Sequence, residues 1–285
     1  MNGIIVIDKP AGWTSHDVVG KLRGILRERR IGHSGTLDPM ATGVLPVFVG
    51  RATRAVEFCE ADEKEYVAEM RFGLQTDTQD TTGTVLAQCT AQVTKEQLEE
   101  VLAGFRGCIS QIPPMYSAIK VQGRKLYELA RRGMEVERPP RQVEIRRLEV
   151  LDAQPDGCRV RVVCSKGTYI RTLCGDIGAA LGCGAAMSSL RRIRAGRFTV
   201  EDAVTIEEAA AEGERLLRPV DALFGAYPAC RLSGAQEKKC RCGSDFLLPE
   251  AENGLYRVYG PDGAFLMLGR QTDGVMHTVK SFFEV

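Results

Sequence analysis

Apolar and polar positions divide the start of the chain into strand, helix, loop and strand. Residues 3–8 are almost entirely apolar, which predicts a buried strand. From Ser15, the predicted N-cap, apolar residues return at helical spacing. Residues 30–43 are rich in Gly, Ser, Thr and Pro and have no period. We therefore expect a loop there, followed by a second apolar strand at residues 44–49.

The middle of the chain changes between strand-like and helical periods. Residues 64–73 place Tyr66 and every second residue after it on one apolar face, which predicts a half-buried strand. Residues 159–165 predict a further strand. Helices are predicted to begin at three threonine caps, namely Thr94 with Gln97 completing a capping box, Thr168 and Thr205.

Two interruptions of this pattern predict how the chain is organised. A Pro-Pro pair ends the regular pattern, and the basic segment after it predicts an insertion at about residues 112–147. Tyr227-Pro228 is a predicted boundary, after which a β-hairpin is expected around the turn residues 260–263. We therefore divide the chain into a larger domain, residues 1–226, and a small β-rich domain, residues 227–285.

Composition narrows the class of protein. Hydrophobic residues make up 44% and charged residues 26% of the 285 residues, as in an ordinary globular protein. No apolar run has the length of a membrane span and no basic leader precedes the first strand, so we expect a cytoplasmic protein with no membrane part. The ten cysteines lack regular spacing, and the tightest group (Cys230, Cys240 and Cys242) has no second pair or nearby His. Reduced structural thiols are predicted, with no metal site.

Charge is uneven along the chain although the net charge is only +1. Residues 120–147 hold nine Lys and Arg against four Asp and Glu, whereas residues 201–221 hold seven acids against two arginines. A second basic cluster comprises Arg191, Arg192, Arg194 and Arg197. Two interpretations stay open at this point: a phosphate-binding face, or ordinary solvated surfaces.

Asp38 lies in the predicted loop, close to His33. Pro39 keeps Asp38 out of helical geometry, and an Asp before Pro is typical of a turn. His33 has no partner at metal-binding spacing, and the chain contains neither a Walker loop nor a dinucleotide fingerprint. Residue types alone therefore leave the role of this loop open.

The loop and five further blocks resemble the bacterial tRNA pseudouridine-55 synthases. The loop block is GHSGTLDPMATGVL at residues 32–45. The others follow in the family's order: DKP at 8–10, KEY at 64–66 running to GLQTDT at 73–78, IPPMYSAIK at 112–120, SKGTYIR at 165–171 and LRR at 190–192. The match covers residues 3 to about 225.

The resemblance implies an α+β pseudouridine synthase fold, with a mixed, mainly antiparallel central sheet flanked by helices and loops. It implies isomerisation of uridine to pseudouridine at position 55 in the tRNA T loop, on a base flipped out of its stack. Asp38 corresponds to the nucleophile, and no cofactor is needed because substrate and product are isomers. Attack on the ribose C1′ and attack on the uracil C6 both stay open.

The remaining site residues are implied by the same resemblance. Tyr66 and Arg171 complete the catalytic set, the tyrosine by stacking and proton removal and the arginine as partner of Asp38. The expected substrate-binding residues are His33, which enters the T loop, Tyr169 and Leu190, which line the pocket, and Lys9 and Pro10 beside it. The insertion is expected to grip RNA phosphates through Lys120, Arg124, Lys125, Arg131 and Arg132.

The resemblance also implies partners. The small C-terminal domain is expected to be PUA-like and to touch the acceptor end of tRNA, while the larger domain holds the T arm. A monomer without an obligatory protein partner is expected. Two rivals remain: a guide-directed rRNA synthase, and a non-catalytic RNA-binding protein or tRNA-folding chaperone.

Overall fold

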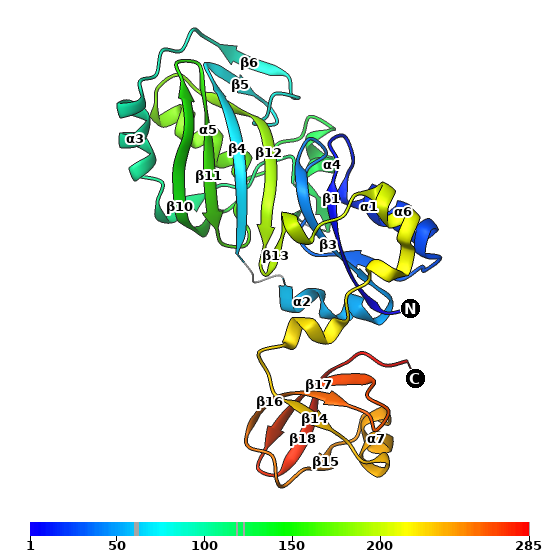
Figure 1. The fold of residues 1–285 in the computed structure, drawn as a ribbon. Coiled ribbons are helices and arrows are strands. Elements are labelled where there is room, and N and C mark those ends of the chain that lie inside the picture. Colours follow the sequence, from blue (N-terminus) through cyan, green and yellow to red (C-terminus); the bar gives the residue numbers. More distant parts are fainter. Residues whose placement is uncertain (60–62, 118, 122, 285) are drawn as a thin grey trace.

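A nine-stranded mixed sheet forms the larger part of the molecule (Figure 1). The computed structural model describes residues 1–59, 63–117, 119–121 and 123–284. The strands run in the order β1-β3-β12-β4-β11-β10-β7, with β2 beside β3 and β13 beside β12, and only the β3–β12 pair is parallel. The predicted mixed, mainly antiparallel sheet is confirmed. Its strands are β1 (Gly3–Lys9), β2 (Ile31–His33), β3 (Thr42–Val49), β4 (Lys64–Phe72), β7 (Gly107–Gln111), β10 (Arg141–Gln154), β11 (Gly157–Cys164), β12 (Ala185–Ala195) and β13 (Phe198–Thr199).

The sheet consists of two half-sheets that meet at β12. On one side β12 pairs with β4 along most of its length, and β11, β10 and β7 continue that half. On the other side, among the described residues, β12 pairs with β3 at only two positions, Arg191 with Thr42 and Arg192 with Gly43. Figure 1 shows β1 and β3 set apart from β4, β10 and β11.

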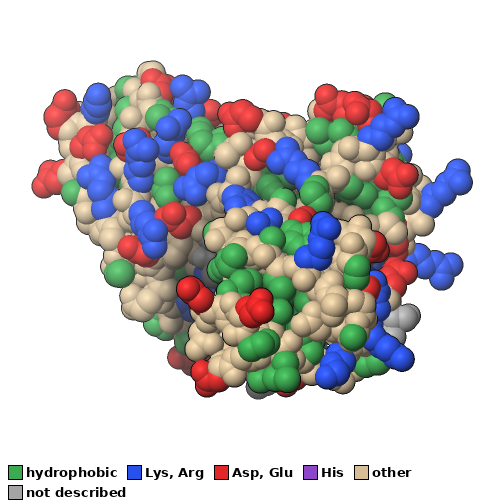
Figure 2. Space-filling view, turned by 60° about the horizontal axis from the view of Figure 1, so that its bottom comes forward, with side chains coloured by type: hydrophobic (Ala, Val, Ile, Leu, Met, Phe, Trp, Pro, Cys, Tyr) green, Lys and Arg blue, Asp and Glu red, His purple; other side chains and the backbone are tan. Residues whose placement is uncertain are grey.

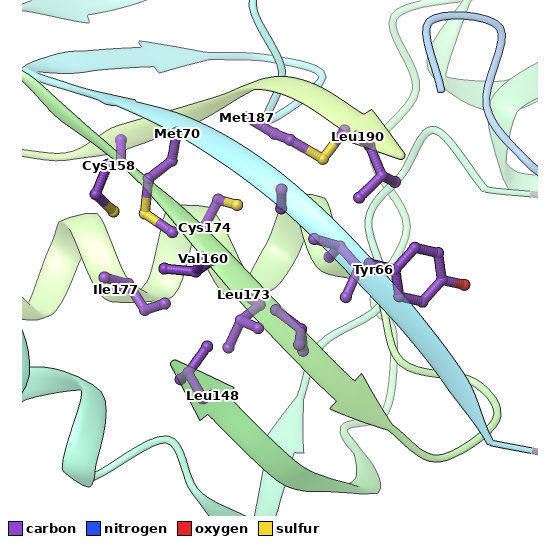
Figure 3. Packing of buried hydrophobic residues seen from close by; sticks show 14 of the residues in the cluster. Tyr66, Met70, Leu148, Cys158, Val160, Leu173, Cys174, Ile177, Met187 and Leu190 are labelled. Carbon is purple, nitrogen blue, oxygen red and sulfur yellow. The ribbon is translucent and has the colours of Figure 1, made fainter. Parts of the chain in front are cut away.

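Each half-sheet has its own core because each is covered by different helices. The core of the β4 half packs against α3 (Lys95–Ala103) and α5 (Ile170–Ala180), and β4 alternates as predicted, with Tyr66, Ala68, Met70 and Phe72 buried. The β1–β3 half buries its inner face against α1 (Ser15–Leu26) and α6 (Ile206–Glu212). Figure 3 shows the first core, with the Tyr66 hydroxyl pointing away from the other labelled side chains.

Helix starts follow the capping chemistry of the sequence, with two corrections. Thr94 and Thr205 cap α3 and α6 with complete capping boxes, as predicted. The cap of α1 is Thr14 rather than Ser15, because Asp17 reaches back to the Thr14 backbone and completes a box there. The cap of α5 is Tyr169 rather than Thr168, whose hydroxyl donates to the Ser165 carbonyl instead.

The predicted insertion is shorter than expected at its C-terminal end. After β7 the chain forms a small hairpin of β8 (Lys120–Val121) and β9 (Arg124–Lys125) and one short helix, α4 (Leu126–Ala130). Residues 141–147 form the first half of β10 in the main sheet instead, because Arg141 to Ile145 pair with β7. A second small hairpin, β5 (Leu74–Thr76) and β6 (Val85–Gln88), follows β4.

The C-terminal residues form a separate five-stranded sheet in the order β14-β16-β17-β18-β15. The predicted hairpin is present as β16 and β17, and α7 (Gly234–Arg241) packs beside it. The other strands are β14 (Ala229–Arg231), β15 (Phe246–Leu247), β16 (Gly254–Tyr259), β17 (Phe265–Thr272) and β18 (Val275–Ser281). The module is thus rich in strands, whereas its PUA-like character and the domain boundary at residue 226 stay predictions.

An aromatic cluster joins the two sheets. Phe224, in the 3₁₀ helix Val220–Phe224, lies 5.8 Å from Phe282 and 5.2 Å from Phe58 of α2 (Val56–Cys59) between ring centroids. Phe282 stacks on Phe265 of β17 at 5.3 Å. The cluster continues into the buried side chains of β1 and β3, so one core crosses the junction between the two parts.

Among the helices of the described ranges, none has the length and apolar character of a transmembrane span. All ten cysteines are free thiols.

Candidate active site

Asp38 lies at the turn of a loop that joins β2 to β3. The loop is tied to the N-terminal segment by hydrogen bonds, because the Ser15 hydroxyl accepts from the Leu37 N–H at 2.8 Å. Within the turn, the Ala41 N–H donates to the Asp38 carbonyl at 3.1 Å. The Asp38 backbone is therefore held rigidly while its side chain remains 36% exposed.

Arg171 grips the Asp38 carboxylate with two nitrogens. Its Nε donates to Oδ2 at 2.8 Å and its Nη2 to Oδ1 at 3.3 Å. Arg171 is only 5% exposed and is itself anchored by the carbonyls of Thr78 (3.0 Å) and Tyr116 (2.8 Å). Asp80, also buried, adds a second carboxylate at 4.0 Å from Nε. A buried, fully bonded guanidinium thus aims a more exposed carboxylate in fixed geometry.

Tyr66 lies at the end of the core nearest this pair. Its ring is 7% exposed and belongs to the core of the β4 half-sheet, beside Leu190 (Figure 3). Burial raises the pKa of the Tyr66 hydroxyl, and Arg192, across from it in β12, partly offsets this rise. The structure therefore places Tyr66 and Leu190 together on one apolar surface of the site.

Tyr169 is fixed through its backbone. The Gln111 side chain accepts from the Tyr169 N–H at 3.0 Å and donates to the Tyr169 carbonyl at 3.3 Å. Gln111 is 1% exposed and ends β7, so this strand positions the start of α5 and with it Arg171. Burial raises the pKa of the Tyr169 hydroxyl, and both Asp38 and Arg171 are near enough to act on it electrostatically.

Lys9 is wholly buried and bonded to backbone carbonyls. Its Nζ donates to the carbonyls of Trp13 (2.5 Å), Pro10 (2.9 Å) and Pro39 (3.3 Å). Burial lowers the pKa of the Lys9 ammonium to about 8, although the nearby Asp38 carboxylate raises it. Lys9 therefore supports the loop from behind, whereas the neighbouring Pro10 ring is exposed.

His33 ends β2 on the other side of the loop. Its side chain is half-buried, and burial lowers the pKa of the imidazole, so the ring is neutral near pH 7. Within the described part of the chain, His33 Nδ1 is buried and has no hydrogen-bond partner. A neutral ring suits contact with an unstacked base more than contact with a phosphate.

The predicted phosphate-gripping residues fall into two groups. Arg124, Arg131 and Arg132 are exposed in the insertion, but Lys125 is half-buried and stacks, like Arg131, over the Tyr127 ring at 5.4 Å. The side chain of Lys120 lies outside the described residues. On the face drawn in Figure 2, Lys and Arg side chains are interspersed with Asp and Glu. The surface shown there therefore carries both signs of charge.

Sequence reasoning left three supporting residues without a role. Asp80 lies just beyond the quoted block at residues 73–78, and Gln111 is a polar residue at a buried strand end. Arg192 is 1% exposed, although it was assigned to a basic surface cluster. No local signal marks Arg192 as the buried arginine, because β12 also carries two serines and two further arginines. Across the described residues, no group of three or more His, Cys, Asp or Glu is arranged to hold a metal.

Comparison with known proteins gives matches along the whole chain. The description "TruB family pseudouridylate synthase (N terminal domain)" matches residues 23–170, and "tRNA pseudouridylate synthase B C-terminal domain" matches residues 171–224. A tRNA pseudouridine synthase B of Clostridium kluyveri is 41% identical over 290 residues, covering 99% of this chain and 100% of that relative. One of Symbiobacterium thermophilum is 50% identical over 239 residues, covering 82% and 79%. A chain in the crystal structure of a Cbf5-Nop10-Gar1 complex superposes with a TM-score of 0.73 at 28% identity, covering 99% of this chain and 85% of that one.

Proposed function

The chain belongs to the TruB family of pseudouridylate synthases and isomerises uridine to pseudouridine in tRNA; within that activity we propose that the target is uridine 55 of the T loop and that Asp38 is the nucleophile. The observation that carries the assignment of Asp38 is its bidentate pairing with the buried Arg171. A carboxylate held in this way is aimed and open to a ligand on its exposed side.

The reaction requires one bond to be exchanged for another. The N1–C1′ bond breaks, the uracil ring turns, and a C5–C1′ bond forms while C5 loses a proton and N1 gains one. Asp38 forms a transient bond to either C1′ or C6 and is then released, as carboxylates are in glycosidases. The Tyr66 hydroxyl, at the edge of the apolar surface it shares with Leu190, is the proposed acceptor of the C5 proton.

A uridine inside the T loop must leave its stack before Asp38 can reach it. We assign His33 to the loop side of the flipped base and Tyr169 and Leu190 to its pocket. The insertion then contacts phosphates around the T arm, and the C-terminal five-stranded module contacts the acceptor end. The protein works as a monomer in the cytoplasm without a protein partner, unlike the Cbf5 chain, whose structure contains Nop10 and Gar1.

The test is incubation of the pure protein with an unmodified tRNA transcript, followed by mapping of pseudouridine. We expect product at the T-loop uridine with no added factor. Asp38→Asn is expected to lower turnover at least ~1,000-fold while the Kd for tRNA changes less than about threefold, because the amide cannot act as a nucleophile. Asp152→Asn, at an exposed position of β10, is the matched control and should leave turnover unchanged.

Four outcomes would contradict parts of the proposal. Substantial turnover by Asp38→Asn would remove Asp38 from its role. Product at another position would overturn the T-loop assignment. Product that appears only with a guide RNA and partner proteins would favour the guide-directed rival, and binding without any product would favour a chaperone.

A further inference from the structure

The three catalytic side chains proposed above come from different half-sheets. Asp38 follows β2 in the β1–β3 half, whereas Tyr66 lies on β4 and Arg171 on α5, which packs on the other half. Main-chain pairing between the halves, among the described residues, is limited to Arg191 with Thr42 and Arg192 with Gly43. The distance between nucleophile and tyrosine therefore depends on how firmly this narrow junction is held.

The side chain of Arg192 spans that junction. Its Nε donates to the Val44 carbonyl at 2.7 Å and its Nη2 donates to the Gly35 carbonyl at 2.8 Å. Gly35 lies near the start of the loop that carries Asp38, and Val44 lies in β3, just after the loop ends. Arg192, on β12, lies directly opposite Tyr66, on β4, in the antiparallel pairing of these two strands. One guanidinium thus links both ends of the nucleophile's loop to the strand beside the tyrosine.

Burial of the Arg192 guanidinium would be unfavourable if the side chain only filled space. It is 1% exposed, and within the described ranges no carboxylate lies at salt-bridge distance from it. Burying a cation on neutral acceptors is less favourable than burying an apolar side chain of similar volume. Only the planar guanidinium fork can reach two carbonyls that face it from different segments.

Two glycines of the loop block fit around this arginine. A Cβ on Gly43 would lie 2.2 Å from the Arg192 carbonyl oxygen, and a Cβ on Gly35 would lie 3.0 Å from Nη1. Both glycines also have positive φ, +102° and +73°. Close approach to Arg192 therefore explains the glycines at positions 35 and 43 of the loop block.

Arg191 adds a second link across the same junction. Its two terminal nitrogens reach the Asp8 carboxylate on β1 at 3.0 Å and 2.7 Å. This pair is 42% and 31% exposed, so its contribution is weaker than that of the buried side chain next to it. Of these two neighbouring arginines of β12, Arg192 is therefore the stronger link across the junction.

We propose that Arg192 is a positioning residue for the isomerisation, which fixes the Asp38 loop against the strand of Tyr66 and so sets the gap in which the uridine reacts. This inference rests on the proposed roles of Asp38 and Tyr66. Arg192 acts through these two groups and does not touch the reacting atoms.

The experiment compares Arg192→Met, Arg192→Lys and the matched control Arg194→Met on unmodified tRNA transcript. Arg194 is the next arginine of β12 but pairs with Glu65 inside one half-sheet, at 3.1 Å. We expect kcat to fall about 100-fold for Met and about 10-fold for Lys, which keeps one of the two bonds, because a shift of about 1 Å at the reacting centre costs roughly that much. KM should stay within about threefold, and Arg194→Met should change kcat less than about threefold.

Hydrogen exchange supplies a readout that does not depend on activity. In Arg192→Lys, amides of residues 35–44 should exchange faster while those of β10 and β11 remain protected. Unchanged kcat in both variants would overturn the proposal, and so would loss of kcat that is accompanied by exchange throughout the sheet or by equal loss of tRNA binding. Failure of the unaltered protein to form pseudouridine would instead count against the proposed function, so the two failures are distinguishable.

Discussion

Three cationic side chains surround one loop carboxylate, and each has a different task. Arg171 faces the carboxylate directly, Lys9 holds carbonyls behind the loop, and Arg192 holds the loop at both ends. All three are nearly or wholly buried. Residue type alone could not separate them, because the sequence shows three basic residues without showing which atoms they face.

Lys9 leads to a prediction about pH at the residue scale. Its folded pKa is about 8, below the ordinary value of 10.5. Between these values the unfolded chain binds the proton and the folded chain does not, so the contribution of Lys9 to stability rises with pH. We expect the free energy of unfolding of the parent, relative to Lys9→Met, to increase between pH 7.5 and pH 9.5.

Guanidinium denaturation of both proteins at the two pH values measures this difference. Other titrating groups are shared by the two proteins and cancel in the comparison. A difference that stays constant with pH would show that Lys9 keeps its proton over this range in the folded protein.

At the scale of helices and strands, local sequence signals predicted the features that depend only on residues close together in the chain. The alternation of β4 and the boxes at Thr94 and Thr205 were predicted correctly, since each depends on residues a few positions apart. Ser15 was a wrong cap prediction. Thr14 is the cap because its N–H donates to the Asp17 carboxylate and its hydroxyl accepts from the Asp17 N–H. The end of the insertion was misplaced because pairing of β10 with β7 cannot be read from charge.

The candidate site shows the same limit. The blocks that resemble the family identified Asp38, Tyr66 and Arg171. In the structure, Arg171 donates to the Asp38 carboxylate at 2.8 Å and 3.3 Å, and Tyr66 lies on the apolar surface that it shares with Leu190. Asp80, Gln111 and Arg192 could not be assigned roles from the sequence. Their partners lie far away in the sequence, namely Arg171 for Asp80, Tyr169 for Gln111, and Gly35 and Val44 for Arg192.

The insertion carries the prediction at this scale. Arg124 and Arg132 are exposed and, in the part of the chain that the structure describes, form no salt bridge, so both are free for phosphates. Replacing both with Ala should weaken tRNA binding and reduce the slope of log K against log salt by about one per lost contact. Binding titrations between 50 and 200 mM salt, the range over which such contacts are screened, measure the slope.

The matched control is Lys95→Ala with Arg159→Ala, at exposed positions of α3 and β11. It removes the same charge and should leave the slope unchanged. Equal slopes for the insertion variant and the parent would show that phosphates are held elsewhere.

For the whole molecule, the aromatic cluster between the two sheets has a measurable role. Phe282 is 3% exposed and touches Phe224 and Phe265, which belong to different parts of the molecule. Phe282→Ala should cost about 3–5 kcal/mol and uncouple the parts, because it opens a cavity in the core that they share. Calorimetry should then resolve two transitions.

Phe283→Ala is the control for that change. Phe283 packs within the C-terminal module, against Arg241 at 5.2 Å, so its loss should lower the stability of that module alone. A single transition for Phe282→Ala, shifted no further than that of Phe283→Ala, would show that the two parts stay coupled without the Phe282 contacts.

The narrow junction at β12 also governs when activity can first exist during synthesis. Asp38 is synthesised early, but its partner Arg171 lies 133 residues later in the chain. Arg192, which donates to the Gly35 carbonyl, lies 157 residues after Gly35. A nascent chain that ends before β12 carries Asp38 and Arg171 but lacks Arg192, whose side chain binds the Gly35 and Val44 carbonyls. On the proposed role of Asp38, modification of RNA is thereby confined to chains that extend through β12.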